Sequence, residues 1–234
     1  MNEIEEGREK VSGKGLVLQI DVYSDVICPW CYVGKRRLER ALKQWDNAVP
    51  VKISWRPFQL NPTMPQQGMD RRQYLEAKFG GPAATRAIYS QVETAGAGEG
   101  ISFAFDRIAR TPNTFTAHRL IWFAERHGKQ DEMVEMLFRQ YFLEGGDIGN
   151  VETLSQAAAS VGFEPAMLET FLVSDEGAEA VKAEEATGHR LGIRGVPYFV
   201  LNGTSALSGA QPPEQFIEVF RQIESGSIAG KAGA

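Results

Sequence analysis

Apolar residues follow two different periods in the first sixty residues of the chain. An apolar run occupies residues 16–23, and residues 51–58 alternate between apolar and polar side chains, so both segments predict strands. Between them, residues 28–45 place apolar side chains three or four positions apart, which predicts a helix. A strand, a crossover helix and a second strand predict a right-handed, parallel β-α-β unit.

The pattern then becomes helical over more than half of the chain, with almost no strand signal. The predicted helices cover residues 70–79, 82–96, 114–127, 131–142, 151–161, 165–173 and 175–191. Asn150 is expected to cap the start of one of them, and Gly128 and Gly162 stand where helices should end. The middle of the chain is therefore expected to be all-helical.

Strand signal returns near the C-terminus. Residues 197–201 read as a strand, and Asn202-Gly203 is a strong two-residue hairpin turn leading into a weaker strand at 204–208. A last amphipathic helix is expected over 212–225. The fold class is therefore α/β: a β-α-β unit and a β-β-α unit in the thioredoxin order, with an all-helical domain inserted between them.

The change of pattern also sets the expected domain boundaries. A thioredoxin-like domain is expected to be built from residues 15–62 and 191–226, and the helical insertion from residues 63–190. Residues 1–14 and 227–234 are expected to be flexible tails, because they are polar or rich in small residues.

Composition and charge limit the kinds of partner that are expected. The 234 residues carry a net charge of −5, which gives no general attraction to nucleic acid or to an anionic membrane. The first residues are charged and lack the apolar core of a signal peptide, so a cytoplasmic protein is expected. The sequence leaves the oligomeric state open.

The only two cysteines are Cys28 and Cys31, in the run Cys28-Pro29-Trp30-Cys31. They fall where a strand is expected to pass into a helix, and the start of a helix stabilises a thiolate. In a reducing compartment a lone pair of this spacing indicates a reactive dithiol, exchanging with protein or small-molecule thiols and disulfides.

Two other interpretations of the pair are weaker. A zinc site needs two further ligands, and the histidines lack zinc-ligand spacing: His118, His127 and His189. An inert, buried pair is disfavoured by Pro29, which suits a first helical turn, and by Trp30, which is bulky beside a turn expected to be exposed. No metal is therefore expected.

The segment Gly195–Phe199 contains the second informative feature. Pro197 stands at the start of a strand, and an X-Pro bond takes the cis form at modest cost. With a thioredoxin-like order, we expect a cis-proline loop beside Cys28. The backbone of Val196 would then be placed to pair with an incoming peptide.

Three segments together resemble the FrnE-like branch of the DsbA family, over about residues 16–224: Ser24–Gly34, Asn113–Leu120 and Gly192–Phe199. The resemblance implies a thioredoxin fold with a helical insertion, and thiol–disulfide exchange by the Cys28-x-x-Cys31 pair. No cofactor is expected, and glutathione is a candidate co-substrate. It implies that Cys28 is the nucleophile, Cys31 the resolving thiol and Pro197 the cis-proline. The chain departs from secreted relatives by lacking a signal peptide, and from some FrnE-like proteins by lacking a second cysteine pair.

Several neighbouring residues are candidates for supporting roles. Asp21 interrupts an apolar strand and is a candidate proton shuttle for the resolving thiol, although strand alternation could instead turn it to a polar face. His118 is a candidate substrate contact or acid, or else a hydrogen-bonded structural histidine. Trp30 is expected to be exposed and to contact substrate. The basic residues 35–37 are expected to form a solvated helix face.

Two alternative functions stay open. The first is a glutathione-dependent isomerase or transferase, of the type of 2-hydroxychromene-2-carboxylate isomerase and the kappa class. Such enzymes do not need a resolving cysteine, so the intact pair speaks against this alternative. The second is a binding protein whose helical part holds a partner, with the dithiol acting as a redox switch.

Overall fold

The computed structural model describes residues 17–46 and 49–226. The strands are β1 (Leu18–Ser24), β2 (Val51–Pro57), β3 (Met69–Asp70), β4 (Arg110–Thr111), β5 (Tyr198–Leu201) and β6 (Ser205–Ser208). The helices are α1 (Pro29–Gln44), α2 (Arg71–Phe79), α3 (Pro82–Ala97), α4 (Phe115–Arg126), α5 (Gln130–Phe142), α6 (Val151–Ser160), α7 (Pro165–Val173), α8 (Ala178–Arg190) and α9 (Pro213–Glu224), with a short 3-10 turn at Phe105–Arg107. The expected tails, 1–14 and 227–234, lie outside the described residues.

The main sheet has the strand order β2-β1-β5-β6. β1 and β2 are parallel, with Val22 opposite Trp55, whereas β5 is antiparallel to both β1 and β6. The β5–β6 turn is made by Asn202 and Gly203, which both have positive φ angles, of 49° and 67°, as a tight hairpin turn requires. The predicted β-α-β and β-β-α units are therefore confirmed.

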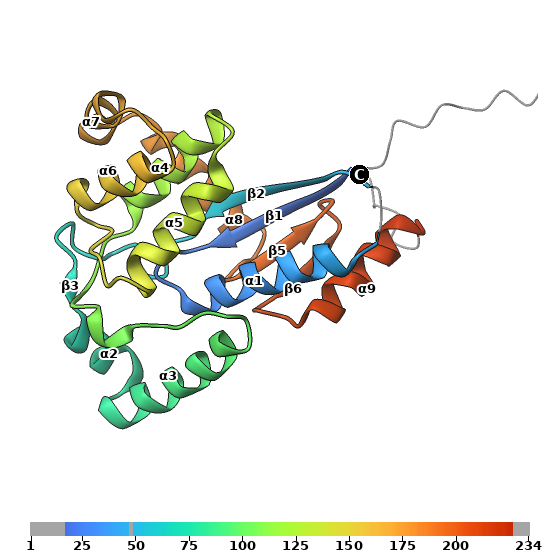
Figure 1. Cartoon of the computed structure of the whole chain (residues 1–234), viewed down its shortest axis with the longest axis horizontal. Coiled ribbons are helices and arrows are strands. Elements are labelled where there is room, and N and C mark those ends of the chain that lie inside the picture. The colour runs from blue at the N-terminus through green and yellow to red at the C-terminus, as the bar shows by residue number, and fades with distance from the viewer. Residues whose placement is uncertain (1–16, 47–48, 227–234) are drawn as a thin grey trace, which may run out of the picture.

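Alternation along β1 divides the sheet into two faces. Leu18, Ile20 and Val22 are buried and belong to the main core, which includes residues of α1 and α9. Tyr23 points to the opposite face, where its ring lies so close to Gly188 of α8 that an added Cβ would be 2.7 Å away. Figure 1 shows α1 and α9 together on one side of the sheet and α8 behind it.

The chain between β2 and β5 is helical, as expected, apart from the two-residue ladder of β3 and β4 and the 3-10 turn. The ladder was not predicted, because two residues are too few to show a period. Asn150 caps α6 by accepting hydrogen bonds from the backbone amides of Glu152 and Thr153. In Figure 1 the α2–α3 hairpin and the α4–α7 group flank the N-terminal end of α1. The proposed domain boundaries stay a prediction.

Candidate active site

Cys28 occupies the N-cap position of α1, and Pro29 takes the first helical position. Pro29 suits that position because its missing amide hydrogen has no acceptor there and its φ angle is already helical. Cys28 is only 5 % exposed, and it lines a cavity of about 250 Å³ together with Pro29 and the half-buried Trp30. The structure therefore corrects the expected exposure of Trp30, because the ring packs against the core at the edge of this cavity.

Cys31 lies one turn further along α1 and is 1 % exposed. Burial raises the pKa of the Cys31 thiol well above its ordinary value, and the neighbouring Cys28 raises it further. The Ser24 hydroxyl and the Asp25 backbone face Cys31 and act in the opposite direction. The two thiols are therefore unequal: Cys28 faces the cavity, and Cys31 is enclosed and stays protonated until a base accepts its proton.

The expected cis-proline loop is present beside the dithiol. The Val196–Pro197 peptide bond is cis, and the Cys28 thiol donates to the carbonyl oxygen of Val196 at an Sγ–O distance of 3.5 Å. Pro197 packs against α1 at Gly34, where an added Cβ would lie 3.0 Å from Pro197 Cγ. The glycine costs helix stability but lets the loop approach, a role that the sequence analysis missed.

A buried acid and a buried histidine lie behind the dithiol. Asp25 is fully buried and accepts hydrogen bonds from the backbone amides of Ile27 and Leu60. His118 on α4 is 4 % exposed, and its Nε2 lies 3.5 Å from Asp25 Oδ1 without forming a hydrogen bond. A small cavity of about 10 Å³ is lined by both His118 and Ser24. Two titratable side chains, His118 on α4 and Asp25, thus lie next to each other behind the dithiol.

Asp21 is not the buried acid that its place in an apolar strand suggested. Its side chain is 37 % exposed, and its carboxylate accepts a hydrogen bond from Arg56 Nε at 2.8 Å. Glu125 and Glu184 lie 3.5 Å from the same guanidinium. Strand alternation turns Asp21 to the α8 face, away from the core that holds the cysteines, whereas the backbone of Asp25 faces Cys31.

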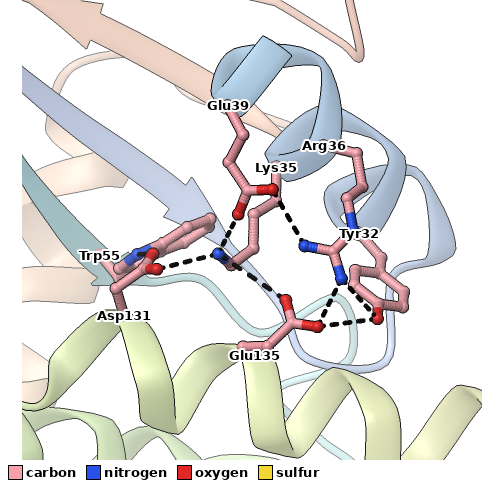
Figure 2. Close-up of polar contacts among 7 residues, drawn as sticks. All are labelled: Tyr32, Lys35, Arg36, Glu39, Trp55, Asp131 and Glu135. Atoms are coloured by element: carbon pink, nitrogen blue, oxygen red, sulfur yellow. Dashed lines mark hydrogen bonds and ion pairs between the residues drawn. The ribbon is translucent and has the colours of Figure 1, made fainter. Parts of the chain in front are cut away.

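The basic residues that follow the dithiol do not form a solvated face. Lys35 is 3 % exposed and contacts the carboxylates of Glu39, Asp131 and Glu135, with Nζ–O distances of 3.0 Å to Asp131 and 3.7 Å to Glu135. Arg36 joins Glu39 and Glu135 from the solvent side. Figure 2 shows these ion pairs linking α1, which carries the cysteines, to α5 in the helical part of the chain.

Groups of three or more His, Cys, Asp or Glu residues that could hold a metal ion are absent from the described ranges. Within the same ranges, no helix combines the length and the apolar character needed to cross a bilayer.

Comparisons with known proteins agree with this geometry. The family model of the DSBA-like thioredoxin domain matches residues 19–221. The uncharacterized protein YwbO of Bacillus subtilis is 30 % identical over 212 residues, covering 86 % of this chain and 94 % of that protein. The crystal structure of a probable DsbA oxidoreductase, SCO1869 from Streptomyces coelicolor, is 30 % identical with a TM-score of 0.83, covering 89 % of this chain and 90 % of the other.

A more distant structure shares the fold. The cytosolic disulfide reductase DsbM from Pseudomonas aeruginosa, in its structure with GSH, is 19 % identical. It has a TM-score of 0.61 and is matched over 88 % of this chain and 99 % of its own.

Proposed function

This chain belongs to the DSBA-like thioredoxin domain family, and on that premise we propose that it catalyses thiol–disulfide exchange through Cys28 and Cys31. The observation that carries the proposal is the inequality of the two thiols. Cys28 borders a cavity at the start of a helix, beside the Val196 carbonyl, while Cys31 is enclosed behind it. That is the arrangement needed for one attacking and one resolving sulfur.

The reaction proceeds in two exchanges. The Cys28 thiolate attacks one sulfur of a substrate disulfide, so the substrate S–S bond breaks, a mixed disulfide forms, and one substrate thiolate leaves and takes up a proton. Cys31 then loses its proton and attacks Cys28 Sγ, which releases the second substrate thiol. The substrate disulfide is reduced by two electrons, and the Cys28–Cys31 dithiol is oxidised to a disulfide.

Val196 and Pro197 would hold the substrate in place. The loop places the Val196 backbone beside Cys28 Sγ, where an extended peptide or a peptide-like thiol could pair with it. Pro29 fixes the first turn of the helix, and Trp30 supplies one apolar wall of the cavity. These assignments rest on position and on the family.

The Asp25–His118 pair is the best-placed proton acceptor for Cys31. The resolving step needs a base because burial raises the pKa of the Cys31 thiol. Asp25 touches the thiol through its backbone and approaches His118 through its carboxylate. Asp21, on the α8 face with Arg56, is not placed for this task.

We further propose that the oxidised enzyme is returned to the dithiol by two molecules of a small thiol such as glutathione, in the cytoplasm. Two observations support this. The distant structure described with GSH is named a cytosolic disulfide reductase. The two cysteines of the chain both belong to the dithiol, so none is left for a structural disulfide of the kind found in oxidising compartments.

The proposal is tested by a glutathione redox titration followed by Trp30 fluorescence and thiol counting. A reversible Cys28–Cys31 disulfide is expected, and a potential near that of thioredoxin, about −270 mV, would make the protein a reductant. A potential near that of DsbA, about −120 mV, would instead indicate isomerase or oxidant-sensing work. The absence of any reversible disulfide would overturn the proposal.

Cys31→Ser separates the alternatives. Turnover of a disulfide substrate should be lost while the mixed disulfide at Cys28 accumulates. A glutathione-dependent isomerase would keep its activity in this variant. A redox-switched binding protein would show no turnover in the wild type, and its affinity for a partner would differ between the reduced and oxidised forms.

A further inference from the structure

The cavity in front of Cys28 has a feature that the exchange reaction does not use. Its wall includes Arg71, the first residue of α2, which is 8 % exposed. A guanidinium cannot lose its charge in a protein, so a buried arginine normally has a carboxylate or several carbonyl oxygens as partners. The groups around Arg71 therefore decide whether its charge is already paired within the protein.

Among the described residues, Arg71 has two hydrogen-bond partners, both of them neutral, and its guanidinium also lies over the rings of Tyr89, Phe105 and Tyr141. Its NH1 and NH2 groups each donate to a phenolic oxygen at 2.6 Å, that of Tyr141 and that of Tyr89 respectively. Its Nε has no hydrogen-bond partner among the described residues, and no carboxylate of those residues forms an ion pair with it. The hydroxyl of Thr111, 1 % exposed, lines the same cavity and faces the phenol of Tyr141.

A second buried arginine shows what a satisfied site looks like in this fold. Arg119 is 5 % exposed and donates to three backbone carbonyl oxygens, at 2.9, 3.2 and 2.6 Å. These acceptors lie at the end of α7 and just beyond it, where helix carbonyls are free and partly negative. Arg119 thus has a structural role, whereas Arg71 has donors left over and faces a cavity.

The two phenols do not neutralise Arg71. Burial raises the pKa of Tyr141 and of Tyr89, and the nearby positive charge of Arg71 only partly opposes this. Both rings therefore stay protonated at neutral pH and contribute oriented hydroxyl groups. The positive charge of Arg71 remains available to an anion that enters the cavity.

The charge of the cavity wall has the opposite sign to the charge of the whole chain. Arg71 and Lys78 line it, and its wall includes no Asp or Glu residue, whereas the chain carries −5. A separate, more open cavity also reaches Arg71, but its wall mixes the basic Arg72 and Arg86 with the acidic Asp70 and Glu76. An anion is therefore favoured on the Cys28 side.

We propose that Arg71, assisted by Lys78, binds a carboxylate of a small disulfide or thiol while Cys28 exchanges with its sulfur. The cavity of about 250 Å³ lies below the usual range of drug-sized sites, about 300–1,000 Å³, which favours a low-molecular-weight compound over a folded protein. Tyr89 and Thr111 would offer hydroxyl groups to the same carboxylate, whereas the Tyr141 hydroxyl donates to the carbonyl oxygen of Arg110 at 3.4 Å. The inference rests on the exchange function proposed above and names the class of its substrate.

The anionic disulfide reacts in the same two steps as in the exchange reaction described above. Cys28 attacks the near sulfur of the anionic disulfide, one carboxylate-bearing thiol leaves, and Cys31 releases the second. The carboxylate bound by Arg71 is not changed. It holds the sulfur in reach of Cys28, and this positioning raises the rate for anionic over neutral disulfides.

The test compares an anionic and a neutral disulfide probe, dithiobis(nitrobenzoate) and dithiodipyridine, by stopped-flow absorbance on the reduced protein. Arg71→Met is expected to slow the anionic probe about tenfold, as for loss of a charge-assisted hydrogen bond, and the neutral probe less than about twofold. Arg71→Lys should keep part of the preference. The matched control is Arg72→Met, because Arg72 is 84 % exposed and paired with Glu76; both rates should stay unchanged.

A second measurement needs no variant and remains available if substitution of Arg71 prevents folding. Iodoacetate and iodoacetamide have nearly the same size and differ in charge, and peptide mapping reports their reaction at Cys28. The ratio of their rates in the folded protein should exceed the ratio in urea about tenfold. Equal ratios, or equal slowing of both disulfide probes in Arg71→Met, would overturn the inference. The exchange proposal itself would fail if the wild type formed no reversible Cys28–Cys31 disulfide in the glutathione titration, an outcome that these rate ratios do not affect.

Discussion

The ion cluster of Figure 2 allows a direct test of what joins the helix that carries the cysteines to the rest of the molecule. Lys35→Met removes the buried ammonium group at its centre and keeps a side chain of similar length. Three carboxylates lose their shared partner: Glu39, Asp131 and Glu135. Lys35 is 3 % exposed, so this is a buried charge and not a surface pair.

The expected magnitude follows from the exposure of each partner. Breaking a buried ion pair by removing one partner costs about 3–5 kcal/mol, because a buried charge is left uncompensated. Asp131 is 53 % exposed, so its pair with Lys35 is discounted to about 0–1 kcal/mol. Arg36 still contacts Glu39 and Glu135 in the variant, so we expect the free energy of unfolding to fall by about 2–3 kcal/mol.

Urea unfolding followed by circular dichroism at neutral pH would measure this loss, and the melting temperature should fall by about 4–12 °C. Lys43→Met is the matched control, because Lys43 lies exposed on the same helix, and its effect should stay within about 0.5 kcal/mol. A loss no larger than that of the control would refute the reasoning and show that desolvation cancels the attraction.

The pH dependence gives a second check on the same cluster. Burial alone lowers the pKa of Lys35, but Asp131 and Glu39 raise it more, so the net pKa lies above the ordinary value of 10.5. A raised pKa means that the contribution is complete below the ordinary pKa and is lost as pH rises through the folded value. The stability difference between wild type and Lys35→Met should therefore shrink above about pH 10.5, and a difference that grows there would contradict the assignment.

Three further predictions concern the site and its surroundings. Burial beside Glu135 raises the pKa of Tyr32 to about 12, so Tyr32 should contribute a loss of stability between about pH 10 and 12 with a slope of up to about 1.4 kcal/mol per pH unit. Tyr32→Phe should remove that contribution in urea unfolding curves and leave the part that is due to Lys35. Gly34→Ala should displace Pro197 by a few tenths of an ångström. The protein should lose stability, because overpacking costs about 1–3 kcal/mol and the better helix propensity of alanine returns only about 1 kcal/mol. Turnover of a peptide disulfide should fall, and an unchanged rate would show that the close approach is not required. His118→Gln should leave mixed-disulfide formation at Cys28 unchanged and prolong the life of that adduct about 100-fold in quenched mass spectrometry, and equal lifetimes would remove His118 from the proton path.

Local signals in the sequence were sufficient to predict the framework of the fold. The strand at residues 16–23, the Asn202-Gly203 turn and the cap at Asn150 each carry their information within a few residues, and the structure confirms all three within two residues. The Cys28-x-x-Cys31 motif and Val196-Pro197 are likewise short, and their juxtaposition followed from the predicted order of elements.

The rest of the site depends on contacts between distant segments, which periodicity does not report. Lys35 was expected in solvent, and it is buried because α5 brings Asp131 and Glu135 against α1. Asp21 was a candidate proton shuttle because it interrupts an apolar strand, yet strand alternation places Asp21 on the outer face, and the loop that follows the strand buries Asp25 instead.

Nothing in the sequence pattern indicated the roles of Arg71 and Gly34. Arg71 is one of two adjacent arginines at the start of a helix, and only the packing of α2 and α3 shows which of them is buried. Gly34 is an ordinary glycine in a helical pattern until the Pro197 loop is placed against it. Both were beyond sequence reasoning because their partners are far away along the chain.

The same separation has a consequence for the newly made protein. Cys28 and Val196 are in contact but stand 168 residues apart. At about 5–20 residues per second, the ribosome exposes the dithiol about 8–34 s before it has made the loop that covers it. During that interval the nascent chain carries two free thiols without the cis-proline loop, so oxidation, alkylation or exchange with the cellular thiol pool during synthesis would act on a dithiol unlike that of the finished enzyme.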